Sequence, residues 1–575
     1  MDAARPAFTS FYFPAGLTAN TYLSPNTALS GNGWATFLLG AMDNNSVAQT
    51  IPIQHPRISY TALFVQDDFK ISSRLTLNLG LRAEHNGPMA DTGYRLTQEL
   101  NLSTPIPELS GSNAPAMPAA VTALRTAAPI YDGAWTFTDS SHPGVLNTPA
   151  VLWEPRIGVA LRINDKTAIR AGYARYVTPT SLTDTLNILG SVYYDGFSAS
   201  TAAFAPLQGV PQETLSNPFP SGLVQPIGKG YGAYTNLGNS ANWYNPNFQP
   251  ETNDRINFSL QRQLPGRVLA DVTYFMNYGR NLPYTRNLNM VDPNIAYTYK
   301  NATTAKVANP FYNLLPADKM PGTLRSQSQV SVSSLLTPYP QYGSLNQLMQ
   351  SGAGDHYRAL QVSLRRPYSN GLTVMLGFNY NNEHDQGFYD DIATYAQNLT
   401  WIPAQTSRFR MTGAAVYELP VGKGRHFLST MNPLLDGIIG GWVVSSLFTY
   451  NTGVPIRLGG AVVNGDPAIS NPTRDHWFNT SAISLLPAFT PRTNPTQYSD
   501  LVGPRIVNLD STIGKQFSIT ERIRFELRFE AYNTLNSLTK ADPITSITSA
   551  SFGRVIDERT GFYGRQIQFS GHLTF

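Results

Sequence analysis

Apolar and charged residues alternate strictly along the segment "RIRFELRFEAYN", from Arg522 to Asn533. In an extended strand successive side chains point to opposite faces, whereas a helix would spread the same residues around its circumference. The pattern therefore predicts a β-strand with two unlike faces. Its apolar face holds Ile523, Phe525, Leu527, Phe529 and Ala531, and its polar face holds Arg522, Arg524, Glu526, Arg528, Glu530 and Tyr532.

Such a strand suits either a soluble sheet with one face in water or a membrane β-barrel with lipid outside and a wet lumen inside. An arginine on the lipid face near the middle of a membrane costs about 2–4 kcal/mol, so in a barrel the charged face must line the lumen. Same-face neighbours lie about 7 Å apart, and we expect Arg524, Glu526 and Arg528 to form a charge ladder with adjacent strands. The ladder either satisfies the wall of a wet interior, which is the favoured interpretation, or contacts a solute.

The same alternation recurs along the chain, mostly as two strands joined by a short turn. The paired segments are 60–70 with 75–82, 156–163 with 167–177, 257–264 with 267–276, 356–366 with 372–380, 408–419 with 441–451, and 506–519 with 522–533. Together with a last strand at the C-terminus they give about 13 strands, each near the length that crosses a membrane at a tilt. The pattern leaves room for one more strand before Pro52.

Short turns alternate with long connections throughout the predicted strands. The long connections span residues 85–155, 178–253, 279–354, 383–407, 452–504 and 534–564. Short periplasmic turns and long extracellular loops are typical of outer-membrane barrels, and a soluble sandwich has no reason to keep this asymmetry. The sequence therefore predicts an all-β fold, a transmembrane antiparallel β-barrel.

Composition agrees with this fold class. Only 14% of the 575 residues are charged, against roughly 25% in ordinary soluble domains. No apolar run reaches the roughly 18 residues of a spanning helix, and the nearest, residues 437–448, is too short. The absence of cysteine excludes disulfides, thiolate zinc sites and cysteine nucleophiles. With a net charge of only +4 and no basic run interleaved with aromatics, we expect no nucleic-acid partner.

Motifs for catalysis are missing from the sequence. The eight histidines form no His-x-x-x-His spacing, and neither a phosphate-binding glycine loop nor a G-x-S-x-G elbow occurs, so we predict no enzyme and no cofactor. Two polar or aromatic clusters in the long connections are candidate ligand sites. They are Glu383, His384, Asp385, Asp390 and Asp391, and the pair Trp477 and Phe478. The first could hold a divalent or cationic ligand or be a solvated loop tip, and the second could stack on a glycan or peptide or pack its own loop.

The C-terminal segment "RQIQFSGHLTF" also alternates. Its apolar face holds Ile567, Phe569, Leu573 and the terminal Phe575, with Gly571 as the one gap. A last strand that ends in an aromatic residue resembles the signal by which the barrel-assembly machinery recognises outer-membrane barrels. The alternative is an edge strand that happens to end in phenylalanine.

Several longer segments resemble the barrel of TonB-dependent outer-membrane receptors. They are "YTALFVQDDFKISSRLTLNLGLRAE", "INFSLQRQLPGRVLADVTYFMNYGRNLP", "YRALQVSLRR", "YELPVGKGRHF", "IGGWVVSSLFTYNTGVP", "FELRFEAYNTLN" and "RQIQFSGHLTF". The subgroup that they resemble carries an N-terminal carboxypeptidase-regulatory-like domain. The resemblance covers residues 33–575, which predicts a receptor barrel there and leaves residues 1–32 as an N-terminal segment, either a loop or a remnant of upstream barrel.

In that family the complete protein has an export signal, a segment that contacts TonB, a plug and a barrel of 22 strands. The first three do not match any part of this sequence, so the resemblance implies the C-terminal part of a transporter for a scarce solute such as a siderophore, a glycan or a peptide. Its implied partners are outer-membrane lipid, the barrel-assembly machinery, a small solute, and TonB only through a missing plug. A passive pore, a surface adhesin and a soluble all-β binding protein are the alternative functions.

Overall fold

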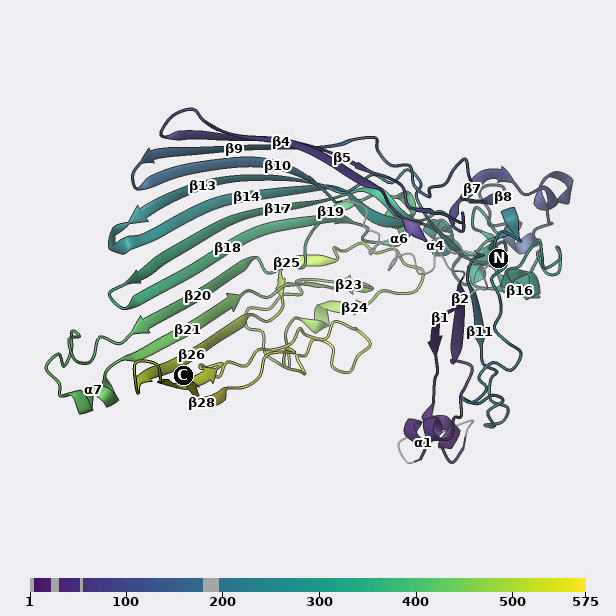
Figure 1. The fold of residues 1–575 in the computed structure, drawn as a ribbon. Helices are drawn as coiled ribbons and strands as arrows, with labels where there is room; N and C mark the ends of the chain where they lie inside the picture. Colours follow the sequence, from purple (N-terminus) through teal and green to yellow (C-terminus); the bar gives the residue numbers. More distant parts are fainter. Residues whose placement is uncertain (1–4, 22–29, 52–54, 179–195) are drawn as a thin grey trace.

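The chain folds around one large, curved antiparallel sheet (Figure 1). The computed structural model describes residues 5–21, 30–51, 55–178 and 196–575. Within this part the sheet holds 15 strands, and two short ones, β12 (Ala241–Tyr244) and β19 (Thr400–Pro403), lie off its continuous path. The remaining 13 strands confirm the number that the alternation predicts. We call this path the wall; its edge strands are β4 and β28, which do not pair with each other.

The strands of the wall follow one another in chain order. They are β4 (Tyr60–Lys70), β5 (Leu75–Asn86), β9 (Leu152–Asn164), β10 (Thr167–Val177), β13 (Thr252–Leu264), β14 (Val268–Asn287), β17 (Leu345–Ser369), β18 (Leu372–Gly387), β20 (Phe409–Glu418), β21 (Trp442–Asn451), β26 (Ile506–Ser518), β27 (Arg524–Tyr532) and β28 (Gln566–Thr574). Each pairs with its chain neighbour in the wall, as expected of hairpins.

The two ends of the wall differ as predicted. Short links join the strands at one end, and long loops join them at the other (Figure 1). The link between β17 and β18 shows why such turns are tight: Asn370 and Gly371 adopt φ angles of 51° and 77°, which two-residue hairpins favour.

Several predicted boundaries are wrong. β5 and β18 end later than predicted, at Asn86 and Gly387, and β9 and β13 begin earlier, at Leu152 and Thr252. β14 continues to Asn287 and β17 begins at Leu345, so the connection predicted over 279–354 is shorter, and these extensions contain register shifts such as that between Gly279 and Leu282. Bulges break the two-residue period, which hides the extensions from the pattern. β27 begins at Arg524 rather than Arg522, because Thr520 Oγ1 accepts a 3.3 Å bond from the Arg522 amide within the preceding turn.

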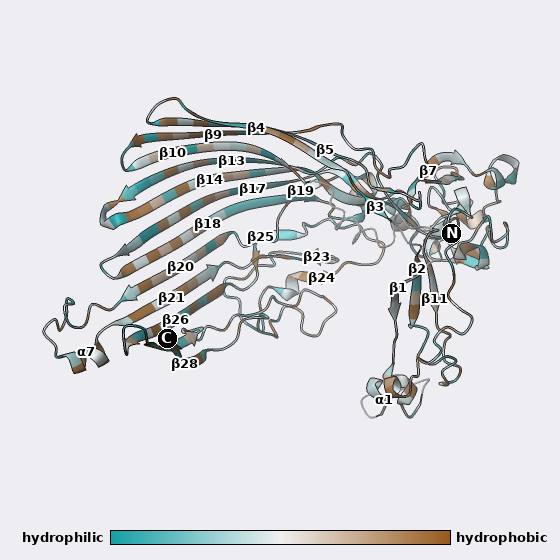
Figure 2. Cartoon of the chain, viewed as in Figure 1, coloured by the Kyte–Doolittle hydropathy of each residue, from teal (hydrophilic) through white to brown (hydrophobic). Residues whose placement is uncertain are grey.

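Strand register sorts the side chains of the wall onto two faces. Leu360 lies opposite Tyr274 and Tyr380, whereas its neighbour Gln361 lies opposite Thr273 and Asn379. Apolar and polar residues alternate along the strands in the same way (Figure 2). We call the apolar side the outer face and the polar side the inner face. Large apolar residues of the outer face stay exposed, for example Phe258 at 53% and Phe569 at 68%.

The buried hydrophobic core lies in the long loops and not in the wall. A cluster that we call the loop core gathers buried residues from 100–345, including Trp135, Trp243, Phe311 and Leu335. A second cluster, around Leu458 and Phe478, lies in the later loops. The small elements of these loops are β3 (Pro56–Arg57), β6 (Ala90–Asp91), β7 (Thr97–Pro105), α2 (Ala119–Thr122), β8 (Asp132–Phe137), α4 (Pro293–Tyr299), β15 (Lys306–Ala308), β16 (Gln329–Ser331), α5 (Val332–Leu335), α6 (Asp391–Ala396), β22 (Pro455–Arg457), β23 (Ala461–Val463), β24 (Ile483–Leu485) and β25 (Gln497–Val502).

The N-terminal residues form a separate structure beside the long-loop end (Figure 1). β1 (Arg5–Ser10), β2 (Val47–Ile51) and β11 (Ala199–Ala202) make a three-stranded sheet, and α1 (Gly33–Leu38) lies at its far end. The strand that the pattern allowed before Pro52 is β2, which belongs to this sheet and not to the wall. Among the described residues, no helix has the length and apolar character needed to cross a membrane.

Candidate functional site

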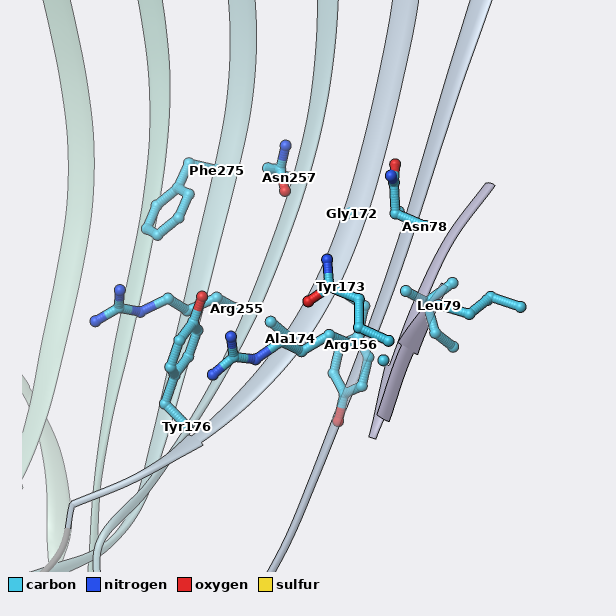
Figure 3. Close-up of a pocket in the computed structure, with 14 residues that line it drawn as sticks. Asn78, Leu79, Arg156, Gly172, Tyr173, Ala174, Tyr176, Arg255, Asn257 and Phe275 are labelled. Atoms are coloured by element: carbon cyan, nitrogen blue, oxygen red, sulfur yellow. The ribbon is translucent and has the colours of Figure 1, made fainter. Parts of the chain in front are cut away.

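The inner face of the wall has a hollow of about 450 Å³ over strands β5, β9, β10, β13 and β14 (Figure 3). Small residues make the room for it. Gly172 lies opposite Gly158 on one side and Asn257 on the other. A Cβ added at Gly172 would lie 2.7 Å from Oδ1 of Asn257, so a larger residue would displace this side chain. Glycine at these strand positions has no side chain to fill the space, and this leaves the hollow open.

Two arginines and a tyrosine form the basic part of the hollow. Cζ of Arg156 lies 5.1 Å from the centre of the Tyr176 ring, and Cζ of Arg255 lies 4.8 Å from it. Both guanidinium groups lie beside this ring in Figure 3. Nη2 of Arg156 is 3.9 Å from a Glu154 oxygen, and Nε of Arg255 donates to Oδ1 of Asn277 at 3.4 Å. Within the described part of the chain no carboxylate forms an ion pair with Arg255, so the hollow suits an anionic group.

Toward the long-loop end, the inner face continues into a hydrogen-bonded cluster of carboxylates. The Tyr60 hydroxyl donates to Glu84 at 2.6 Å, and Arg82 bonds the same Glu84 oxygen. Glu154 on the neighbouring strand lies 3.7 Å from Arg82. Both carboxylates are nearly fully buried. The cluster ties the edge strand β4 and its neighbour β5 to β9, beside the hollow.

The predicted lumen charges lie on the inner face of β27, except Arg522, which lies in the preceding turn. Glu526, Arg528 and Glu530 border a second hollow of about 400 Å³. The expected ladder across strands is not formed: the register partners of Glu526 are Gln516 and His572, and those of Arg528 are Gly514 and Ser570. Instead Arg528 Nε donates to Glu526 within the strand at 2.7 Å. Arg524, at the start of the strand, lies opposite Ser518 and Thr574.

The predicted acidic cluster is divided between two faces and a helix. By register Glu383 and Asp385 belong to the inner face, and Asp385 lies opposite Asp355; His384 belongs to the outer face. Glu383 accepts a 2.8 Å bond from Thr406. Within the described residues no three His, Asp or Glu side chains gather as a metal site would require.

The other two members of that cluster have structural partners. Asp390 caps helix α6 by accepting a bond from the Ala393 amide at 2.7 Å. Asp391 accepts a bond from the Tyr297 hydroxyl of helix α4. Burial, together with this bond, raises the pKa of Tyr297. Asp390 thus stabilises its own helix and Asp391 joins two loops, and ligand binding by the cluster stays a prediction.

Trp477 and Phe478 belong to the interior of their loop. Phe478 is 1% exposed and Trp477 is 9% exposed. Trp477 Nε1 donates to the Val502 carbonyl at 2.8 Å, and the Phe478 ring lies 5.3 Å from that of Phe552. Buried rings offer little surface for stacking, so this arrangement favours the alternative of loop packing. Their role in stacking on a ligand stays a prediction.

The C-terminal residues lie as the alternation predicts. Ile567, Phe569 and Leu573 are on the outer face of β28, opposite Ala531, Phe529 and Phe525 of β27. The terminal Phe575 follows the end of the strand and is 93% exposed. Their role in assembly stays a prediction.

Sequence reasoning missed Arg156, Tyr176 and Arg255. The alternation places all three on polar faces, but their meeting depends on the registers of β9, β10 and β13, which no single strand reveals. The available signal is the set of glycines inside these strands, since Gly80, Gly158 and Gly172 all line the same hollow.

A wall of amphipathic antiparallel strands, with lipid-suited side chains outside, polar ones inside, and loops of unequal length at its ends, defines an outer-membrane β-barrel protein. The model of the family described as outer membrane beta barrel domain matches residues 2–568, so the chain belongs to this family. The protein is therefore a protein of the outer membrane. A comparison with curated protein sequences finds no match.

Solved structures of outer-membrane receptors are similar over most of this chain. The ferric-catecholate import receptor Fiu from Escherichia coli K12, in a closed form, is 11% identical over 97% of this chain and 48% of its own, with a TM-score of 0.39. FpvA from Pseudomonas aeruginosa, bound to a pyoverdine, is 9% identical over 92% of this chain and 39% of its own, with a TM-score of 0.38. The FrpB iron transporter from Neisseria meningitidis is 10% identical over 92% and 58%, with a TM-score of 0.37. The chain thus spans 39% to 58% of the length of these three structures.

Proposed function

We propose that the chain forms the wall of a TonB-dependent outer-membrane receptor that takes up a scarce solute, and that it has no enzymatic role. The observation that carries this proposal is the polar inner face, with its basic hollow, below loops that have their own hydrophobic core. Such loops can hold a fixed shape for capturing a ligand. The resemblance of the strand segments to TonB-dependent receptors, including the subgroup with a carboxypeptidase-regulatory-like domain, supports the same proposal.

The hollow favours an anionic solute. Arg156 and Arg255 present two guanidinium groups beside the Tyr176 ring, and such groups bind carboxylates and phosphates through paired hydrogen bonds. Among a siderophore, a glycan and a peptide, a negatively charged iron chelate best suits this chemistry. A neutral glycan would instead need several exposed aromatic rings on which to stack.

The wall also requires strand partners at both edges. β4 and β28 each have one hydrogen-bonded neighbour in the described sheet, and unpaired backbone groups are strongly unfavourable in lipid. We propose that the working receptor completes the barrel with further strands between these edges. In this proposal a plug inside the barrel contacts TonB, and outer-membrane lipid covers the outer face.

The exposed apolar side of β28, with Phe575 beyond it, is the part that we propose the barrel-assembly machinery recognises. Phe575 contributes no buried contact, being 93% exposed, so its removal should leave the folded wall intact. Deleting Phe575 should lower the yield of heat-modifiable barrel in the outer membrane, while Phe575→Tyr should keep it. An unchanged yield after the deletion would remove this role.

Uptake by cells that express the complete gene tests the transport proposal. Three radiolabelled probes would be offered, namely a ferric catecholate, a maltodextrin and a dipeptide, to cells with and without TonB. We expect the ferric catecholate alone to accumulate, only with TonB, and at least about tenfold less with the double substitution Arg156→Gln and Arg255→Gln. Accumulation that is independent of TonB would indicate a passive pore, and surface binding without accumulation of any probe would indicate an adhesin.

A further inference from the structure

One link at the short-turn end of the wall is unlike the others. The residues between β20 and β21 include a helix, α7 (Pro433–Ile439), that extends beyond the wall (Figure 1). The helix is well defined locally: the Asn432 side chain accepts a 2.9 Å bond from the Leu435 amide, and Pro433 occupies its first turn. Its length and its capping by Asn432 indicate a regular helix and not merely a longer turn.

Helix α7 has one polar and one apolar side. Its polar side carries Asp436, whose Oδ1 accepts a 2.7 Å bond from the Lys423 amide of the same link. The apolar side, facing away, is exposed: Leu434 at 82%, Ile438 at 68%, and Leu435 and Ile439 at more than two fifths each. Phe427 and Leu428 of the same link are also more than half exposed. No described part of the chain covers this surface.

Hydrogen bonds place α7 against the outer face of the wall. Trp442 Nε1 donates to the Ile438 carbonyl at 2.9 Å, and Lys515 Nζ donates to the Gly437 carbonyl at 2.6 Å. Trp442 and Lys515 are register partners on the outer face. The Trp442 ring also lies 6.3 Å from that of Phe529, another outer-face residue. The helix thus lies beside the lipid-facing surface and not over the lumen.

The chemistry of the link fits the boundary between hydrocarbon and headgroups. The helix adjoins the outer face through the bond from Trp442 to the Ile438 carbonyl. Lys423 and Arg425 supply cationic groups in the same link, and Arg425 forms a 3.2 Å ion pair with Glu418. An amphipathic helix with basic residues nearby lies flat in this boundary, where tryptophan is also enriched. At the opposite rim, the outer face carries the stacked rings of His356 and Trp401, 4.0 Å apart.

We propose that α7 is an interfacial anchor, which inserts Leu434, Leu435, Ile438 and Ile439 into the phospholipid of the periplasmic leaflet and fixes the depth of the wall in the membrane. The carbonyls at the end of the helix hold Lys515 and Trp442, so the anchor is tied to β21 and β26. This inference rests on the membrane position of the wall and is independent of the proposed solute uptake.

Fluorescence quenching tests the anchor directly. The chain contains no cysteine, so one label can be attached at Leu434→Cys or Ile438→Cys, with Leu485→Cys in the long loops as a control that is 57% exposed. Each full-length variant would be folded into vesicles of phosphatidylethanolamine and phosphatidylglycerol, and its folding verified by heat modifiability. Quenching by brominated phospholipid and by aqueous iodide would then be compared.

We expect brominated lipid to quench the labels at 434 and 438 at least about threefold more than the label at 485, with iodide giving the reverse order. Equal iodide access at all three positions would overturn the anchor. Protection from both quenchers at 434 and 438 would also overturn it, because a second copy or another protein would then cover the helix.

Discussion

The wall and the loop core place their apolar side chains in different surroundings. In the loop core, Phe311 and Leu335 are fully buried among neighbouring loops, as in a water-soluble domain. In the wall, Leu360 and Phe569 project outward with at least two fifths of their surface exposed. Apolar side chains thus stabilise the loop core by moving from water into the protein interior. They stabilise the wall by moving from water into lipid. Judged only by the exposed fraction of its apolar side chains, the wall would be taken for a poorly folded region.

The largest expected effect lies in the loop core. Phe311→Ala removes a fully buried ring, and we expect it to cost about 3–5 kcal/mol of the free energy of unfolding of the loops. Leu314→Ala, at an exposed position of the same loop, should change it by less than about 0.5 kcal/mol. Pulse proteolysis in urea would measure both. Equal effects would mean that the loops have no packed core.

Leu360 and Gln361 are neighbours on β17 that lie on opposite faces of the wall, so they provide a matched pair of positions. Leu360→Arg places a charge on the outer face and should cost about 2–4 kcal/mol in lipid, whereas Gln361→Arg places it on the inner face and should cost far less. Unfolding by guanidinium in vesicles measures the difference. Similar losses for the two variants would contradict the assignment of faces.

Acid should weaken the loops through Asp91. Burial raises the pKa of this carboxyl, but bonds from the His55 amide at 2.7 Å and from Arg95 at 3.1 Å outweigh it and lower the pKa overall. The ionised form therefore stabilises the loop above the ordinary pKa of about 3.9, and this contribution is lost as the pH falls through the lowered value.

Asp91→Asn tests this titration. The substitution should cost about 1.5–3 kcal/mol at neutral pH, since it removes hydrogen bonds to a buried charge. It should also flatten the dependence of loop unfolding on pH below about 4. An identical acid profile in the variant would assign the effect to other carboxylates.

The smallest expected effect is the ion pair on the inner face of β27. Glu526 and Arg528 are partly exposed to the wet interior, so the double-substitution cycle with Glu526→Gln and Arg528→Gln should give only about 0.2–1 kcal/mol. Added salt should reduce the value further. A coupling several times larger, insensitive to salt, would indicate that this part of the lumen is dry.

Sequence alternation was sufficient for the strands of the wall and for its faces, because each is set within a few residues. β4 and β10 begin and end at the predicted residues. It was insufficient where the period is broken, as in the bulged extension of β14. It also could not find the hollow, since Arg156 and Arg255 are neighbours of Tyr176 only through the registers of three strands.

The loops show the same limit more strongly. Asp390 and Asp391 are close to Glu383 in sequence, yet one caps a helix and the other bonds Tyr297 from a distant loop. Trp477 and Phe478 look available in a long polar connection, but their loop folds around them. Long-range packing of this kind has no period in the sequence, so residue type alone suggested ligand sites.

The most direct test of the two-faced wall is a label scan along β17, at single cysteines in positions 360–364 of the chain in lipid vesicles. Spin labels there would be compared for access to oxygen, which concentrates in lipid, and to a water-soluble nickel chelate. We predict alternation, with oxygen favoured at Leu360, Val362 and Leu364 and the chelate favoured at Gln361 and Ser363. Uniform access to the chelate, or no alternation, would contradict a wall with lipid on one side and water on the other.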